Sequence, residues 1–75
     1  MKMLSYSEIL AKSAKLISAA DADRESKLAD YMANKTESNW RKAAKSEARA
    51  NRIHAERMEV NGFAFRRMKA GVIPN

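Results

Sequence analysis

The chain has 75 residues and contains no cysteine and a single histidine. These counts exclude disulfides and argue against zinc centres, most of which use several cysteine or histidine ligands. The 15 lysine and arginine residues outnumber the nine acidic residues, which gives a formal net charge of +6. A chain of this length forms one small domain, residues 1–75, with a thin core, and its alanine-rich, glycine-poor composition favours helix.

The first predicted helix covers about residues 6–19. Ser5 and Glu8 have the spacing of a capping box at its start. From Tyr6 to Ala20 the apolar residues return at helical spacing on one side, while lysines lie on the other. The polar residues near the start also interrupt the apolar run that a signal peptide needs, so we expect none.

A second helix is expected from about residue 22 to residue 34. Asp21 and Asp23 are good N-caps for it, and Asn34 can adopt the left-handed conformation that ends a helix. Together with Glu25 the two aspartates form an acidic run, and the helix dipole favours acids at this place. Our interpretation of the run is therefore capping rather than metal binding.

The third predicted helix, from about residue 37 to residue 60, is the longest, and Thr36 or Ser38 can cap it. Gly62 is expected to end it. A short fourth helix follows over residues 63–69.

The four segments predict an all-α fold, a small bundle of about four helices. Gly71 is the expected stop of the last helix. The core would contain large apolar residues from the inner sides of all four segments. These are Ile9, Leu10, Leu16, Ile17, Leu28, Met32, Trp40, Met58 and Phe65.

The net positive charge lies entirely in the second half of the chain. Residues 1–37 contain six cations and six anions, whereas residues 38–75 contain nine cations and three anions. Four cations of the third helix recur at spacings of four, four and three, which places them on one side. Such a row can follow the phosphates of nucleic acid; the alternative is a solvated face that keeps the protein soluble. The residues predicted to contact phosphates are Arg41, Lys45, Arg49 and Arg52, and Lys42, Arg66, Arg67 and Lys69 are predicted to extend this nucleic-acid-binding patch. We call Arg41, Lys42, Lys45, Arg49 and Arg52 together the basic stripe.

Three aromatic residues near these cations have two interpretations. Trp40 could stack on an unpaired base, but it lies on an alanine-rich side that favours a place in the core. Phe63 and Phe65 are two residues apart, so one helix face cannot carry both, and one of them can be exposed beside the cations that follow. Packing of both in the core is the interpretation we favour.

Glu47, Asn51 and His54 recur at spacings of four and three on the inward side of the third helix. Acid–base chemistry there would need a nucleophile, a second histidine or a carboxylate pair in support, and no such motif occurs. A polar boundary or a hydrogen-bond network explains the three residues better. No phosphate-binding loop or metal-ligand cluster occurs either, so we expect no enzyme, no cofactor and no bound metal.

The stretches MKMLSYSEILAKSAKLISAADADRES and NRIHAERMEVNGFAFRRMKAGVIPN resemble the small proteins encoded just downstream of the UvsW helicase in T-even bacteriophages. The resemblance covers the whole chain. It implies a helical bundle similar to the HRDC module, an accessory domain of RecQ-type helicases and RNase D that binds nucleic acid or protein through a basic surface without catalytic residues. It also implies a place in phage replication, recombination or repair.

Our leading hypothesis is a non-catalytic module that binds nucleic acid, with DNA, single-stranded or branched, favoured over RNA, and without sequence specificity. A helicase or a recombination protein is a further expected partner. The alternative is an adaptor that docks on an acidic surface of a helicase, a single-strand-binding protein or a host enzyme. No run of about 18 apolar residues occurs, so we expect no membrane contact. A cytoplasmic monomer is the default expectation.

Overall fold

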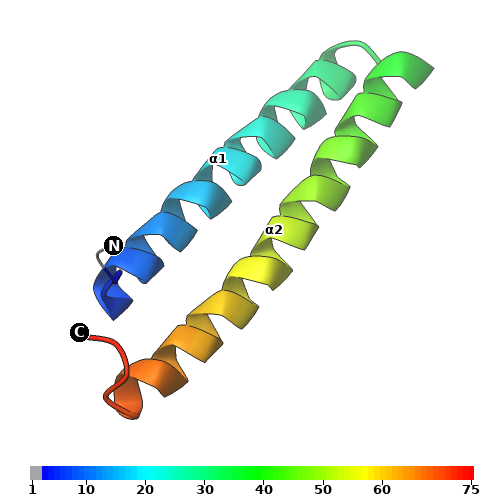
Figure 1. The fold of residues 1–75 in the computed structure, drawn as a ribbon. Coiled ribbons are helices and arrows are strands. Elements are labelled where there is room, and N and C mark those ends of the chain that lie inside the picture. The colour runs from blue at the N-terminus through cyan, green and yellow to red at the C-terminus, as the bar shows by residue number, and fades with distance from the viewer. Residues whose placement is uncertain (1–2) are drawn as a thin grey trace.

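The computed structural model describes residues 3–75; residues 1 and 2, which the predicted domain includes, lie outside this part. Two long helices, α1 (Tyr6–Ala33) and α2 (Glu37–Lys69), run antiparallel and form a hairpin (Figure 1). The hairpin is a rod 52 Å long and 19 by 15 Å across. An all-α fold is thus confirmed for residues 3–75. The four-helix bundle is not supported, because two helices replace the four predicted, and an HRDC-like arrangement is not confirmed.

The predicted break near residue 21 was wrong, because α1 continues without interruption through Asp21 and Asp23. Both carboxylates instead accept hydrogen bonds from α2. Asp21 Oδ1 lies 3.1 Å from His54 Nε2, and Asp23 Oδ2 lies 2.5 Å from Ser46 Oγ. An aspartate in a helix interior costs only a fraction of a kcal/mol relative to better helix formers. The contacts with the partner helix therefore outweigh the local preference for a cap.

The predicted break at Gly62 was wrong for a similar reason. A helix-interior glycine costs about 1 kcal/mol relative to alanine, which the packing of a 33-residue helix offsets. The real stop is Gly71, as predicted, with a φ of 78°. Its amide donates to the carbonyl oxygen of Met68 at 3.1 Å, and the amide of Val72 donates to that of Arg67 at 2.9 Å. These two hydrogen bonds form the Schellman motif that ends many helices.

The caps predicted at the starts of α1 and α2 are confirmed, whereas those predicted at Asp21 and Asp23 are not. Ser5 Oγ accepts a hydrogen bond from the amide of Glu8 at 3.2 Å, and the Glu8 carboxylate accepts one from the amide of Ser5 at 3.3 Å. Thr36 caps α2 by accepting from the amide of Asn39 at 3.1 Å. The prediction of a left-handed conformation at Asn34 was wrong, because this residue has an extended backbone with φ −147° and ψ 95°. The Asn39 side chain holds the turn by donating to the carbonyl oxygen of Asn34 at 2.8 Å.

The two helices meet along one narrow seam of small side chains. Its fully buried members are Ser13 and Ala20 on α1 and Ser46, Ala50 and Ala64 on α2. Ser13 and Ala20 are seven residues apart, and Ala50 and Ala64 are fourteen apart, which is the heptad period of a coiled coil. Small side chains on this period let the two backbones approach closely.

The predicted core was largely wrong. Of its nine residues, only Ile9 and Ile17 are half-buried, and the others are exposed. The exposed ones are Leu10, Leu16, Leu28, Met32, Trp40, Met58 and Phe65. The physical reason is geometric, because a hairpin of two helices has only one seam, and serine and alanine occupy it.

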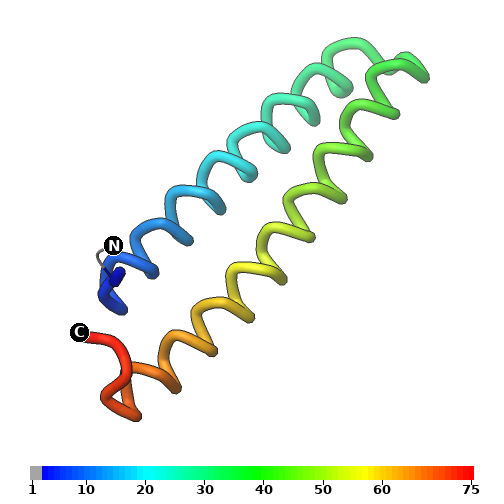
Figure 2. The backbone as a smooth tube through the Cα atoms, viewed as in Figure 1, coloured from blue at the N-terminus to red at the C-terminus, as the bar shows by residue number. Residues whose placement is uncertain are grey.

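The segment that follows α2 returns to the start of α1. The amide of Tyr6 donates to the carbonyl oxygen of Pro74 at 2.8 Å, and the amide of Ser7 donates to that of Asn75 at 3.2 Å. The rings of Tyr6 and Phe65 lie 6.0 Å apart nearby. Figure 2 shows the start of α1 and the segment after α2 side by side at this end of the rod.

Candidate nucleic-acid interface

The basic stripe lies on one flank of α2, and three of its members, Lys42, Lys45 and Arg49, border a groove beside the seam. All five of its side chains are exposed. From Arg41 to Arg52 the stripe rises eleven residues, or about 16 Å along the helix. Helical periodicity therefore predicted the display of these cations correctly.

The protein's own acids neutralise little of the basic stripe. Arg41 Nη2 lies 2.7 Å from Glu37 Oε1, but both side chains are largely exposed, so water screens this pair. The other four cations have no ion pair within 4.0 Å in residues 3–75. Arg52 and Glu56, which are four residues apart on α2, form no ion pair within this distance there. Four of the five charges thus remain available to a partner.

A groove beside the seam adds one more cation to this surface. Its lining residues are Asp23, Lys27, Lys42, Lys45, Ser46 and Arg49. The hydrogen bond from Ser46 holds the pKa of Asp23 below its ordinary value of 3.8, and the charges of Lys27 and Arg49 lower it further, against a smaller opposing effect of desolvation. Asp23 is therefore an anion at neutral pH, one negative charge among four positive ones.

Arg66, Arg67 and Lys69 form a separate cationic group at the end of α2. All three are exposed. Arg66 lies fourteen residues after Arg52, or about 21 Å along the helix. Glu56 and Glu59 lie between the two groups. The eight predicted residues thus form two positive surfaces rather than one continuous patch.

Phe63 and Phe65 are both exposed, so the prediction that both pack in the core was wrong. The Arg67 guanidinium lies 4.6 Å from the centre of the Phe63 ring, and Lys69 Nζ lies 5.6 Å from that of Phe65. Cations at these distances interact favourably with aromatic rings. Each ring is therefore covered on one side by a cation of its own helix.

Trp40 is 57% exposed at the start of α2, so the prediction that it lies in the core was wrong. On one side it borders a shallow depression together with Arg41 and Lys45 of the basic stripe. On the other side it borders a groove between the helices with Leu28 and Tyr31. The ring is accessible beside the cations, as a base-stacking residue must be.

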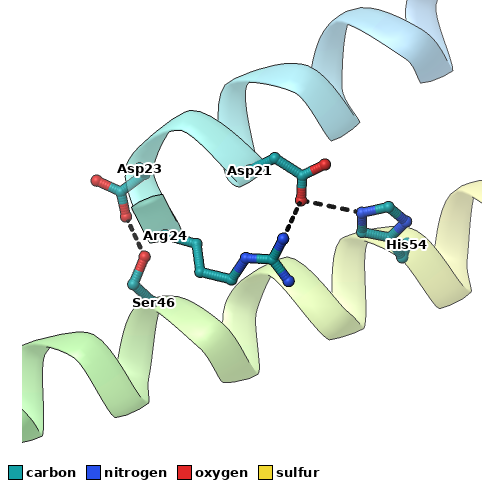
Figure 3. A network of polar contacts seen from close by, with 5 residues as sticks. All are labelled: Asp21, Asp23, Arg24, Ser46 and His54. Carbon is teal, nitrogen blue, oxygen red and sulfur yellow. Dashed lines mark hydrogen bonds and ion pairs between the residues drawn. The ribbon is translucent and has the colours of Figure 1, made fainter. Parts of the chain in front are cut away.

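Asp21, Arg24 and His54 form a polar network across the hairpin (Figure 3). His54 Nε2 donates to Asp21 Oδ1 at 3.1 Å, and Arg24 Nη2 lies 3.6 Å from the same oxygen. The predicted companions of His54, Glu47 and Asn51, are exposed and do not join it. Asp21 was missed because its partner lies 33 residues away in the sequence.

Within residues 3–75 no group of three or more histidine and acidic side chains is placed to hold a metal ion. No helix in this range has the length and apolar character that crossing a bilayer requires. The chain matches no family model, no curated protein and no solved structure. The resemblance to the phage proteins stays a prediction.

Proposed function

We propose that this protein binds nucleic acid without catalysing a reaction, and that single-stranded or branched DNA is the preferred ligand. The observation that carries the proposal is the basic stripe, with five exposed cations on one flank of α2 and four of them outside any ion pair. A concentrated positive surface of this kind commonly meets a polyanion. The resemblance to the phage proteins would place the binding in replication, recombination or repair.

The spacing of the cations suits a phosphate backbone. Arg41, Lys45 and Arg49 follow one another at intervals of four residues, a rise of about 6 Å each, so several phosphates of one strand can be contacted at once. Each phosphate neutralised releases counterions, which makes the affinity strongly dependent on salt. No side chains on this flank are arranged to contact base edges, so we expect one affinity for all sequences.

Exposed aromatic rings favour an unpaired strand over a duplex. Trp40 lies at one end of the basic stripe, and Phe63 lies beside the second cationic group. Bases of a single strand can stack on such rings, and each stacked base contributes about 1–3 kcal/mol. A duplex hides its bases from these rings.

The proposal is tested by fluorescence titrations with labelled single-stranded, duplex and forked DNA at several salt concentrations. We expect the Arg49→Ala/Arg52→Ala variant to bind all DNA sequences more weakly, with a salt slope lower by about 0.7 per lost contact on single strands. The matched control is Lys12→Ala/Lys15→Ala, which removes the same charge from exposed positions of α1. Absence of binding by the native chain at low salt would refute the proposal.

A second candidate is the adaptor, and one observation favours it. Leu28 and Trp40 are large, apolar and exposed, and they line one groove between the helices. Contiguous exposed apolar surface commonly marks a protein-interaction site. An adaptor would bind DNA negligibly and would use these side chains together with the cations. The native-chain titration above separates the two candidates.

A further inference from the structure

On each helix, large apolar residues recur at one angular position beside the seam, with polar residues such as Asp21 on α1 and Glu47 on α2 between them. We call each of these rows a second stripe. On α1, Leu10 and Leu28 are eighteen residues apart, which is five turns of an α-helix. On α2, Trp40 and Met58 have the same separation, and Phe65 follows seven residues after Met58. All five are exposed. A helix that presents two adjacent apolar stripes is typical of a bundle in which it packs against two neighbours.

Both second stripes lie on the same face of the hairpin. Leu28 and Trp40 line one groove near the turn. At the other end, the ring of Phe65 lies 6.0 Å from the ring of Tyr6. We call this surface the apolar face.

The opposite face has a different character. Asp23 lies 200° around α1 from Asp21, and the groove beside Asp23 contains Lys42 and Arg49 of the basic stripe. Positive charge and apolar surface are thus separated onto different sides of the rod.

The seam alone gives the hairpin little hydrophobic stabilisation. Its buried side chains are serines and alanines, joined only by half-buried larger residues such as Ile9, Ile17, Ile53 and Val60. By contrast, 52% of Leu28, 57% of Trp40 and 71% of Met58 remain exposed. An isolated pair of helices of this kind leaves most of its apolar side-chain surface in water. Covering the apolar face would provide the core of large side chains that the hairpin lacks.

The dimensions and charges of the apolar face suit a second copy of the chain. The broad side of the hairpin measures 52 by 19 Å in outline, or about 1,000 Å², so it is large enough to hold the roughly 800 Å² that each partner buries in a standard interface. Its central charges have mixed signs, with Arg24 beside Glu25 and Glu47. Two such faces related by a two-fold axis can pair opposite charges. The cations of the basic stripe point away from the contact and do not repel one another across it.

We propose that the apolar face binds a second copy of this chain, so that two hairpins form an antiparallel four-helix bundle. The large residues of the second stripes then form its centre. Both basic stripes remain on the outside of the bundle, one on each hairpin. This replaces the monomer expected from the sequence and does not depend on nucleic-acid binding. In the dimer Trp40 is covered, so base stacking there is left to Phe63, which is exposed outside the second stripes.

The first test is the molar mass of the native chain in solution, measured by sedimentation equilibrium over about a thousandfold range of concentration. We expect a shift from one to two chains of 8.4 kDa and a midpoint of thermal unfolding that rises with concentration. A mass of one chain and a constant midpoint throughout this range would overturn the proposal.

Two leucines of α1 provide a matched pair of variants. Leu28 is 52% exposed on the apolar face, and Leu16 is 48% exposed away from it. We expect Leu28→Glu to raise the dissociation constant of the dimer at least about 100-fold, since both copies lose an apolar contact and gain a charge there. Leu16→Glu should leave the dimer intact. Equal effects of the two variants, or no effect of Leu28→Glu, would contradict the proposed face.

A third measurement does not depend on how Leu28→Glu folds. Met58 is highly exposed and the chain has no cysteine, so Met58→Cys gives one attachment site for a spin label. Mixed with isotope-labelled native chain, the labelled variant should broaden amide signals of the native copy near Leu10, Leu28 and Phe65. Amide signals of the basic-stripe residues in the native copy should broaden less. Broadening that is absent, or strongest at the basic stripe, would overturn the proposal.

Discussion

Ser13 on α1 donates a hydrogen bond of 2.7 Å to Asn61 Oδ1 on α2, 48 residues further along the chain. Ser13 is only 1% exposed, and no buried side-chain nitrogen or oxygen of residues 3–75 lacks a partner. A helix pair lined by alanine could slide by a heptad with little change in packing. Because sliding would separate Ser13 from Asn61 and bury an unpaired hydroxyl, this contact sets the register of the hairpin.

Loss of that hydroxyl should destabilise the protein. We expect Ser13→Ala to lower the free energy of unfolding by about 1 kcal/mol, the usual contribution of a neutral hydrogen bond. The control is Ser18→Ala, an exposed position of the same helix where alanine should be neutral or slightly favourable. Urea unfolding followed by circular dichroism measures both. Equal stabilities of the two variants would contradict the role given to Ser13.

The close approach of the helices should make the seam intolerant of larger side chains. Ala50 is completely buried, whereas Ala48, two residues earlier, is exposed. We expect Ala50→Leu to lower the free energy of unfolding by about 1–3 kcal/mol through overpacking. Ala48→Leu changes the helix propensity by the same amount as Ala50→Leu, but it should have little effect on the free energy of unfolding because Ala48 is exposed. If both variants were as stable as the native chain, the helices would be further apart than the seam indicates.

The helix starts could be predicted from the sequence because they depend on neighbours in the chain. Ser5 with Glu8, and Thr36 with Asn39, complete their hydrogen bonds within three residues. The number of helices could not be predicted in this way. Asp21 and Asp23 resemble caps locally, and their hydrogen bonds with His54 and Ser46 form only when α2 packs against a continuous α1.

For the candidate site, the exposure of the cations could be predicted from the sequence, but the exposure of the aromatic and apolar residues could not. The exposure of Arg49 and Arg52 follows from helical periodicity, which is a local property. Burial of large apolar residues depends on how many helices surround them. Trp40 and Met58 were expected inside because a bundle of four helices would cover them, and a hairpin does not.

The two glycines of the chain should respond to alanine in opposite directions. Gly62 lies inside α2, and an added Cβ would meet only the Arg66 side chain, at 3.8 Å. Gly62→Ala should therefore raise the free energy of unfolding by about 0.5–1 kcal/mol. Gly71→Ala should lower it by about 1–2 kcal/mol, because φ at this position is +78°. Thermal unfolding of both variants against the native chain tests the signs, and equal signs would contradict the helix end at Gly71.

The hydrogen bond between Ser46 and Asp23 should make the stability depend on pH in the acid range. It lowers the pKa of Asp23 in the folded chain below the ordinary 3.8, so the folded state binds this proton less readily than the unfolded state. The resulting stabilisation is complete above pH 3.8 and is lost as the pH falls through the folded pKa. We expect the stability difference between the native chain and Asp23→Asn to shrink across this window. Ser46→Ala should weaken the same dependence, and an unchanged difference down to about pH 2.5 would contradict the contact.

The separation of the two cationic groups leads to a prediction about ligand length. Arg66 lies about 21 Å beyond Arg52 along α2, so a short single strand can contact the basic stripe without reaching Arg66 or Arg67. We expect Arg66→Ala/Arg67→Ala to leave the affinity for such a short strand unchanged. A longer strand can reach both groups, and for it the same variant should lower the salt slope by about 0.7 per lost contact. The Arg49→Ala/Arg52→Ala variant should weaken binding of both lengths. A short strand can lose contacts only with the cations that it reaches. Equal effects of the two variants on the short strand would therefore mean that the basic stripe and the second cationic group act as one surface, and would contradict their separation.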